Sequence, residues 1–228
     1  MSNPDVPRGL ASEMLNLRKW LERLERNSYQ QIVSYLELRA ILGYDHRIPP
    51  LRGWSISPDL ALLLIRLLET KKPRSVLDLG SGFSTVICAR YAKQSDATVI
   101  SVDHNSHFAK QTRSLLKEWK LQDYARVITA KMACGYYDLT PLLQEKLAFD
   151  FVVIDGPPAG AHRDPMVRGG LLPRYSDLLV PRAIIIMDDY KREGEQMVVS
   201  KWASAGLVKI MSVDTTLDKH AAILRFEG

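Results

Sequence analysis

Aspartate and glycine residues follow four apolar segments of the chain, at positions where they could bind a ligand. These positions are Asp78-Leu79-Gly80, Asp103-His104, Asp155-Gly156 and Asp188-Asp189. A carboxylate can accept hydrogen bonds from sugar hydroxyls, take up a proton or bind a cation, and glycine lets the backbone approach a ligand closely. If the four segments are parallel strands of one sheet, their carboxyl ends share one edge, and the four positions form a single site.

An alternation of strand and helix patterns from Arg74 onward predicts the sheet that this arrangement needs. Runs such as 151–154 are apolar at every position, which is typical of parallel strands covered by helices on both faces. The predicted strands are 75–79, 98–103, 126–131, 149–155, 183–189, 207–213 and 221–226, and the predicted helices between them include 85–92, 107–120 and 193–205. The last two strands are joined by residues 214–220, too few for a crossover helix, so we expect a C-terminal antiparallel hairpin. The predicted fold class is α/β, a Rossmann-like, mostly parallel sheet of seven strands.

Helical periodicity before this sheet predicts an N-terminal helical extension. Apolar residues recur at helical spacing over residues 11–42, with Asn27-Ser28 as a candidate break between two helices. Ser57 and Pro58 fit the N-cap and the first position of a further helix. We expect residues 1–53 to be an extension that acts either as a lid or in homodimerisation, and residues 54–228 to be the sheet domain.

Composition and charge restrict the class of protein and of partner. The 228 residues are 46% hydrophobic and 25% charged, as in an ordinary globular protein. An apolar run of about 18 residues, as needed to span a bilayer, is missing, and so is a signal-peptide pattern. Cys88 and Cys134 lack metal or disulfide spacing, so we expect a cytoplasmic protein without a membrane partner. The net charge of +5 is spread along the chain, which disfavours nucleic acid as a partner.

Residues 80–82, Gly-Ser-Gly, follow a predicted strand and precede a predicted helix, as in loops that bind nucleotide-type cofactors. Asp103 ends the next predicted strand, 21 residues after Gly82, where it can accept hydrogen bonds from two ribose hydroxyls. Dinucleotide enzymes share both features, but Thr85 stands where their third glycine would be. Asp78 would also repel a pyrophosphate, whereas it could organise the loop and an amino-acid ammonium group. The pattern favours a cofactor that joins a nucleoside to an amino acid.

These motifs resemble those of class I S-adenosylmethionine-dependent methyltransferases. Residues 76–85 are similar to their first motif, residues 100–103 to their ribose-binding strand and residues 149–156 to their fourth-strand motif, and the likeness extends over about residues 54–226. It implies S-adenosylmethionine as the cofactor. The cofactor-binding residues that it implies are Asp78, Gly80, Ser81, Gly82, Phe83, Ser84, Thr85, Asp103, His104 and Asp155.

The carboxylates after the fourth and fifth strands resemble those of small metal-dependent O-methyltransferases of the catechol, caffeoyl-CoA and macrocin types. Three converging carboxylates repel one another, and Mg²⁺ or another divalent cation would relieve this repulsion and lower the pKa of an acceptor hydroxyl. The candidate metal ligands are therefore Asp155, Asp188 and Asp189. The simpler interpretation is that Asp155 borders the cofactor without a metal and that the other two cap a helix and a turn.

The catalytic base is a separate question, because Pro158 stands where catechol-type enzymes have a lysine. His162 is our candidate, since a neutral imidazole can accept a hydroxyl proton near pH 7. The predicted catalytic residues are thus Asp155, His162 and Asp188. Three nearby arginines could bind an anionic substrate group, but exposure to solvent is the preferred expectation for all of them; they are Arg163, Arg168 and Arg192.

The resulting prediction is methyl transfer to a hydroxyl of a small-molecule or sugar-like acceptor. Three alternatives stay open: an N-methyltransferase or RNA methyltransferase on the same scaffold, an NAD-dependent dehydrogenase, and a non-catalytic interaction protein. Methylation of a flipped nucleic-acid base is disfavoured, because Ala159 follows Pro157-Pro158 where those enzymes carry a stacking aromatic residue.

Overall fold

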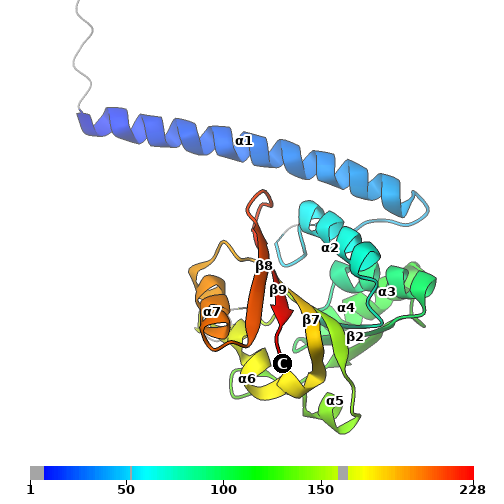
Figure 1. Cartoon of the computed structure of the whole chain (residues 1–228). Coiled ribbons are helices and arrows are strands. Elements are labelled where there is room, and N and C mark those ends of the chain that lie inside the picture. Colours follow the sequence, from blue (N-terminus) through cyan, green and yellow to red (C-terminus); the bar gives the residue numbers. More distant parts are fainter. Residues whose placement is uncertain (1–7, 52, 159–163) are drawn as a thin grey trace, which may run out of the picture.

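The computed structural model describes residues 8–51, 53–158 and 164–228, which form one seven-stranded sheet with helices on both faces (Figure 1). The helices are α1 (Arg8–Leu42), α2 (Pro58–Lys71), α3 (Phe83–Ser95), α4 (Ser106–Glu118), α5 (Thr140–Gln144), α6 (Leu171–Tyr175) and α7 (Glu193–Ser204), with short 3₁₀ turns η2 (Val167–Gly170) and η3 (Ser176–Leu178). The sheet strands are β1 (Ser75–Leu79), β2 (Thr98–Asp103), β3 (Arg126–Thr129), β6 (Phe149–Ile154), β7 (Leu179–Met187), β8 (Val208–Asp214) and β9 (Ala221–Phe226). A separate two-stranded hairpin consists of β4 (Met132–Ala133) and β5 (Tyr136–Tyr137).

The order of the strands reverses at the centre of the sheet. The order is β3-β2-β1-β6-β7-β9-β8, so the chain first builds outward on one side of β1 and then continues on the other side from β6. β1, β2, β3, β6 and β7 are parallel, and β9 is antiparallel to both β7 and β8. The predicted Rossmann-like sheet with a C-terminal antiparallel hairpin is confirmed. Ligands of such sheets bind where the order reverses, which here is beyond the ends of β1 and β6.

Both faces of the central strands are buried, as their continuous apolar runs predict. Leu77, Leu79 and Val152 face one cluster of buried side chains, which includes α6 and α7. Val76 and Phe151 face the other cluster, which includes α2 and α3. Each fully buried aliphatic side chain contributes roughly 1.5–3 kcal/mol, so the two clusters hold the strand ends rigidly in place.

The N-terminal segment is one long helix rather than two. α1 continues through Asn27-Ser28, so the candidate break is wrong. The reason is tertiary: the Asn27 side-chain amide donates to Asp218 Oδ1 at 2.7 Å, which gives this polar residue a partner without interrupting the helix. Asn and Ser are only weak helix breakers, and such a contact overrides their preference.

The C-terminal half of α1 is attached to the sheet domain through a buried carboxylate. Asp59 Oδ2 accepts hydrogen bonds from the Gln31 amide at 2.6 Å and from the Asp218 backbone at 2.8 Å. Ser57 occupies the N-cap of α2 as predicted, but its hydroxyl donates to Asp59 instead of capping the helix. The Asp59 carboxylate therefore joins α1, α2 and the β8–β9 connection.

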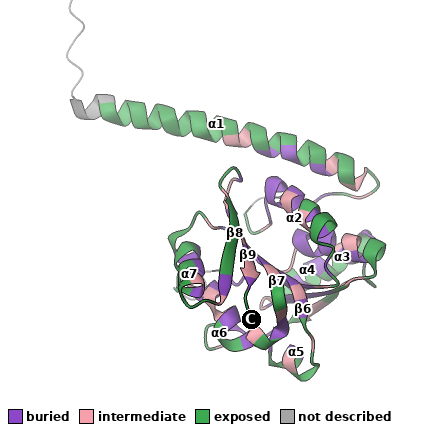
Figure 2. Ribbon diagram, viewed as in Figure 1, coloured by how far each residue is buried: buried purple, intermediate pink, exposed green. Residues whose placement is uncertain are grey.

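The N-terminal half of α1 extends beyond the domain, and its residues 12–26 are exposed (Figures 1 and 2). Leu17, Trp20 and Leu21 are each more than half exposed there. Exposed apolar side chains in this position fit homodimerisation, one of the two roles expected for this extension; both this role and that of a lid stay predictions. None of the described helices combines the length and the apolar character that crossing a bilayer requires.

Candidate active site

Asp78 lies beneath the loop that follows β1. Its Oδ2 atom accepts hydrogen bonds from the hydroxyls of Thr85 at 2.6 Å, Ser84 at 3.1 Å and Ser101 at 3.2 Å. Complete burial raises the pKa of Asp78 to about 7, although the three hydroxyls oppose this shift. Asp78, Ser84 and Thr85 thus organise the loop from below, as the sequence indicates for Asp78, but none of them lines the adjacent cavities.

Gly80 brings the loop after β1 against the chain after β6. Its φ of +108° is a backbone conformation that residues with a side chain rarely adopt. A Cβ atom here would lie 2.9 Å from Asp155 C and from Gly156 N, both in the backbone. A Cβ on Gly82 would meet none of the described atoms within 4 Å. Gly80 is therefore required by the packing of the two loops, and Gly82 leaves open space beside them.

The Asp103 carboxylate holds the same loop from the neighbouring strand. Its Oδ2 accepts hydrogen bonds from the Ser81 hydroxyl at 2.9 Å and the Ser81 backbone at 3.2 Å. Its Oδ1 accepts one from the Asn105 backbone at 2.8 Å and lies 3.5 Å from His104 Nδ1. The structure thus brings together four residues that the sequence assigns to the cofactor: Gly80, Ser81, Asp103 and His104.

Two adjoining cavities lie at this edge of the sheet, with Trp54, Ser81 and Phe108 in the walls of both. One, of about 100 Å³, reaches from Asp103 to the end of β6. The other, of about 380 Å³, extends over Gly82 and Phe83. Trp54 is 75% exposed and forms part of the cavity walls rather than of the core. Tyr137 is buried and also borders the smaller cavity.

The three predicted metal ligands converge, but they do not all face the cavity. One oxygen of each of Asp155, Asp188 and Asp189 lies within 4.8 Å of the others. Asp155 and Asp189 line the smaller cavity, whereas Asp188 is 1% exposed and lies behind them. Burial and the negative charge of Asp188 raise the pKa of Asp155 well above its ordinary value.

Arg168 lies among these carboxylates, which the sequence did not indicate. It is 3% exposed, so the expectation that it faces solvent is wrong. Its Nη2 atom is 2.8 Å from Asp189 Oδ2 and 3.5 Å from Asp155 Oδ1. The one signal in the sequence was the repulsion expected among the acidic residues at the strand ends, which requires a positive charge nearby. A metal cation or an arginine side chain can supply this charge.

Further charged residues complete this cluster. Arg192, which is half exposed, contacts Asp189 Oδ2 at 2.9 Å, and Lys219 Nζ lies 3.8 Å from Asp189 Oδ1. Glu195, on the first turn of α7, is buried 3.6 Å from the Nε atom of Arg168. His162 and Arg163 lie outside the described residues, so the predicted base has no position here.

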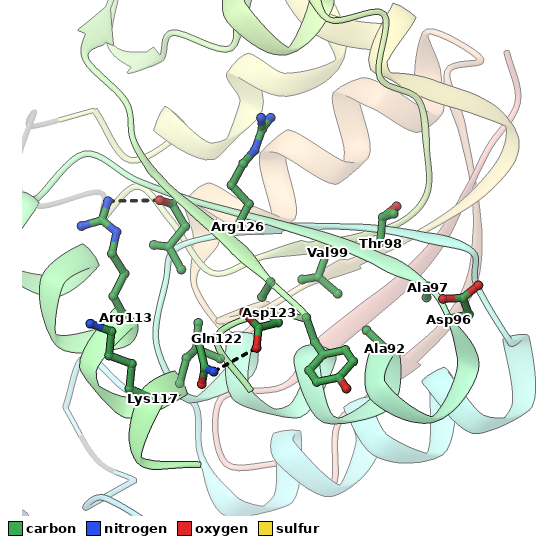
Figure 3. A pocket seen from close by; sticks show the side chains of 14 residues that line it. Ala92, Asp96, Ala97, Thr98, Val99, Arg113, Lys117, Gln122, Asp123 and Arg126 are labelled. Atoms are coloured by element: carbon green, nitrogen blue, oxygen red, sulfur yellow. Dashed lines mark hydrogen bonds between the residues drawn. The ribbon is translucent and has the colours of Figure 1, made fainter. Parts of the chain in front are cut away.

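A larger pocket, of about 700 Å³, lies at the opposite edge of the sheet, where β2 and β3 begin (Figure 3). Arg113, Lys117 and Arg126 line it together with the acidic Asp96 and Asp123. Arg113 is engaged in a hydrogen bond to the Val127 carbonyl at 3.0 Å. Because charges of both signs meet there and the strand ends with their acidic residues are distant, this pocket is not the candidate active site.

Comparison with known proteins agrees with the fold. A family model described as a methyltransferase domain matches residues 77–190, half of the chain. No curated protein matches the sequence. An O-methyltransferase from Bacillus cereus, solved in complex with SAH, is 19% identical with a TM-score of 0.61 over 87% of this chain and 91% of that one.

Two further solved structures are similar over most of their length. TomG, the O-methyltransferase of Streptomyces achromogenes involved in tomaymycin synthesis and solved with SAM, is 16% identical (TM-score 0.57; 77% of this chain, 82% of that one). An SAH-bound methyltransferase of Podospora anserina is 14% identical (TM-score 0.59; 100% of both chains). At these identities, the likeness establishes the fold.

Proposed function

The chain belongs to the methyltransferase-domain family, and we propose that it transfers the methyl group of S-adenosylmethionine to a hydroxyl oxygen of a small-molecule or sugar-like acceptor. One observation carries this proposal: a single cavity joins the loop at Ser81, the carboxylate of Asp103 and the carboxylate of Asp155. The cavity therefore has two groups that can bind a nucleoside, Ser81 and Asp103, beside a carboxylate that can act on an acceptor hydroxyl, Asp155.

The cofactor would bind along the ends of β1 and β2. Asp103 already accepts two hydrogen bonds from Ser81 and one from Asn105. A carboxylate has about four acceptor positions, so Asp103 can keep these three and accept one more hydrogen bond from a ribose hydroxyl. Gly80 and Gly82 let the methionine part of the cofactor approach the loop backbone. The Bacillus cereus and Streptomyces achromogenes O-methyltransferases, solved with SAH and SAM, support this choice of cofactor.

The reaction is an in-line displacement on the sulfonium methyl group. A lone pair of the acceptor oxygen forms the new C–O bond, and the S–C bond breaks with its electrons remaining on sulfur, so S-adenosylhomocysteine leaves as a neutral thioether. The hydroxyl proton must pass to a base. Asp155 is suited to this step because it faces the cavity and because its raised pKa makes it a stronger base than an ordinary carboxylate.

The predicted divalent cation would supply a second route, by lowering the pKa of the acceptor hydroxyl. Its ligands would be Asp155, Asp188 and Asp189, whose oxygens are close enough together. Arg168, however, already contacts two of these three carboxylates. The residues around this position therefore fit a cation poorly.

The cofactor is tested by calorimetric titration of S-adenosylhomocysteine into the wild type and into Asp103→Ala. We expect binding to the wild type and at least about tenfold weaker binding to the variant, since a ribose hydrogen bond to a charged group is lost. Asp123→Ala, which removes an exposed carboxylate at the opposite edge of the sheet, is the matched control and should bind like the wild type. A folded wild type that binds neither S-adenosylhomocysteine nor S-adenosylmethionine would refute the proposal.

The acceptor class is tested by transfer of a radiolabelled methyl group to panels of hydroxyl, amine and RNA acceptors. Labelled ethers from diols or sugars are the expected product. Transfer to amines or RNA alone would favour the alternative methyltransferases. A change in NADH fluorescence on mixing with the protein would favour the dehydrogenase instead.

A further inference from the structure

The Arg168 guanidinium group occupies the centre of the acidic cluster. Its Nη2 donates to the Asp155 carbonyl at 2.9 Å and to Asp189 Oδ2 at 2.8 Å, and its Nη1 donates to the Asp188 carbonyl at 3.0 Å. The two carbonyls lie just beyond the ends of β6 and β7. One side chain thus links both strand ends to the carboxylates that follow them.

Moving Arg168 out of this position would be unfavourable in free energy. The side chain is 3% exposed, and the η2 turn that carries it packs against α7. Moving it away would leave the buried Asp188 carbonyl and the part-buried Asp155 carbonyl without this donor. It would also leave Glu195, which is 1% exposed, without its nearest buried cation. The guanidinium is a fixed part of the site.

A divalent cation bound to Asp189 would have to compete with cationic side chains for the oxygen atoms of this carboxylate. Mg²⁺ binds carboxylate oxygens at about 2.1 Å, so a cation on Asp189 Oδ2 would lie within about 5 Å of Arg168 Nη2. The other oxygen of Asp189 faces Lys219 Nζ at 3.8 Å, and Arg192 also contacts Oδ2 at 2.9 Å. Both oxygens of this predicted ligand therefore already face cations.

The charge of the cluster is close to balanced without a metal. Among the residues that the structure describes, four carboxylates meet here, those of Asp155, Asp188, Asp189 and Glu195. Three cationic side chains face them, those of Arg168, Arg192 and Lys219. Even with all four carboxylates ionised, adding a divalent cation would turn the net charge of the cluster from negative to positive at a buried place, where repulsion between like charges is only weakly screened.

We infer that Arg168 takes the place of the divalent cation in this site, so that the protein works without a resident metal. Arg168 is a positioning residue: it holds Asp155 at the cavity wall and sets the charge behind it. The inference rests on the proposed function for its meaning in catalysis. Its test measures metal binding, and so it can fail or succeed independently of methyl transfer.

Binding of Mn²⁺ is followed by electron paramagnetic resonance on the EDTA-treated full chain, with and without S-adenosylhomocysteine. For the wild type we expect no stoichiometric site with a Kd below about 1 mM. A one-to-one site tighter than this in the wild type overturns the inference. Because this arm needs no variant, the result does not depend on whether a substituted protein folds.

Arg168→Gln removes the charge and keeps a side chain that can still donate a hydrogen bond. We expect it to gain an Mn²⁺ site at least about tenfold tighter than any in the wild type, since ligand charge sets the affinity of such sites. Arg168→Lys, which keeps one positive charge, should exclude the ion as the wild type does. A folded Arg168→Gln that binds no Mn²⁺ overturns the inference.

Arg192→Gln is the matched control. It removes a cation that contacts the same Asp189 oxygen at 2.9 Å but that is half exposed at the rim of the cluster. We expect it to bind Mn²⁺ no better than the wild type. Equal gains in both variants would show that total charge, and not the place of Arg168, excludes the metal, and would also overturn the inference.

Discussion

The buried carboxyl group of Asp78 makes the stability of the fold depend on pH in a way that a single substitution can isolate. Burial raises its pKa from 3.8 to about 7 in the folded chain. In the unfolded chain the group ionises near its ordinary value. Between these two pH values, the unfolded chain has released a proton that the folded chain still holds. The free energy of unfolding therefore falls as pH rises through this window and is constant, for this group, above it.

The size of the effect follows from the shift. A difference of one pKa unit corresponds to about 1.4 kcal/mol, so a rise from 3.8 to about 7 amounts to about 4 kcal/mol between pH 4 and pH 8. Asp78→Asn keeps the shape of the protonated side chain and one oxygen acceptor for the hydroxyls of Ser84, Thr85 and Ser101. It cannot ionise, and so it lacks this contribution.

The assay is urea denaturation of the wild type and of Asp78→Asn at several pH values from 4 to 8. We expect the free energy of unfolding of the wild type, relative to the variant, to decrease by about 4 kcal/mol across this range. Other buried carboxyl groups, including Asp155 and Asp188, titrate in both proteins and cancel in the difference. A difference that stays constant with pH would refute the reasoning, because it would mean that the three hydroxyls outweigh burial and keep Asp78 ionised in the folded chain.

Three other substitutions test the packing of the loop after β1 and the attachment of α1. Gly80→Ala should lower the free energy of unfolding by about 1–3 kcal/mol, because φ is +108° and the Cβ would lie 2.9 Å from backbone atoms of Asp155 and Gly156. Gly82→Ala, where the Cβ meets open space, should cost less than about 1 kcal/mol, and equal losses in urea denaturation would contradict this account. Asp59→Ala should cost at least about 2 kcal/mol and accelerate amide hydrogen exchange in the C-terminal half of α1, since Gln31 and the Asp218 backbone lose their acceptor. Unchanged exchange in α1 would show that other contacts attach this helix.

Local sequence patterns were sufficient to predict the strands of the sheet and the residues of the site that lie at the strand ends. Apolar runs and their spacing predicted the seven strands, because a strand buried on both faces must be apolar at consecutive positions. The same apolar pattern shows where each strand ends, and so Gly80, Asp103 and Asp155, which end or follow strands, were predicted to lie together. The continuity of α1 was not predicted. Asn27 and Ser28 do not favour a helix by themselves, and the residue that gives Asn27 a hydrogen-bond partner, Asp218, lies 191 residues away in the sequence.

The positions of the strand ends in the sequence predict which carboxylates meet at the edge of the sheet, whereas the residue that balances their charge depends on the tertiary structure. Strand-end residues converge whatever fills the space beyond them, because parallel strands share one edge. Arg168 lies in a short turn with no period to read, and its burial depends on the ends of β6 and β7 and on α7 meeting around it. The same dependence explains why Asp188 lies behind the cavity and Asp189 beside it: the two residues are adjacent in sequence, and the direction of each side chain is set by the packing around the end of β7.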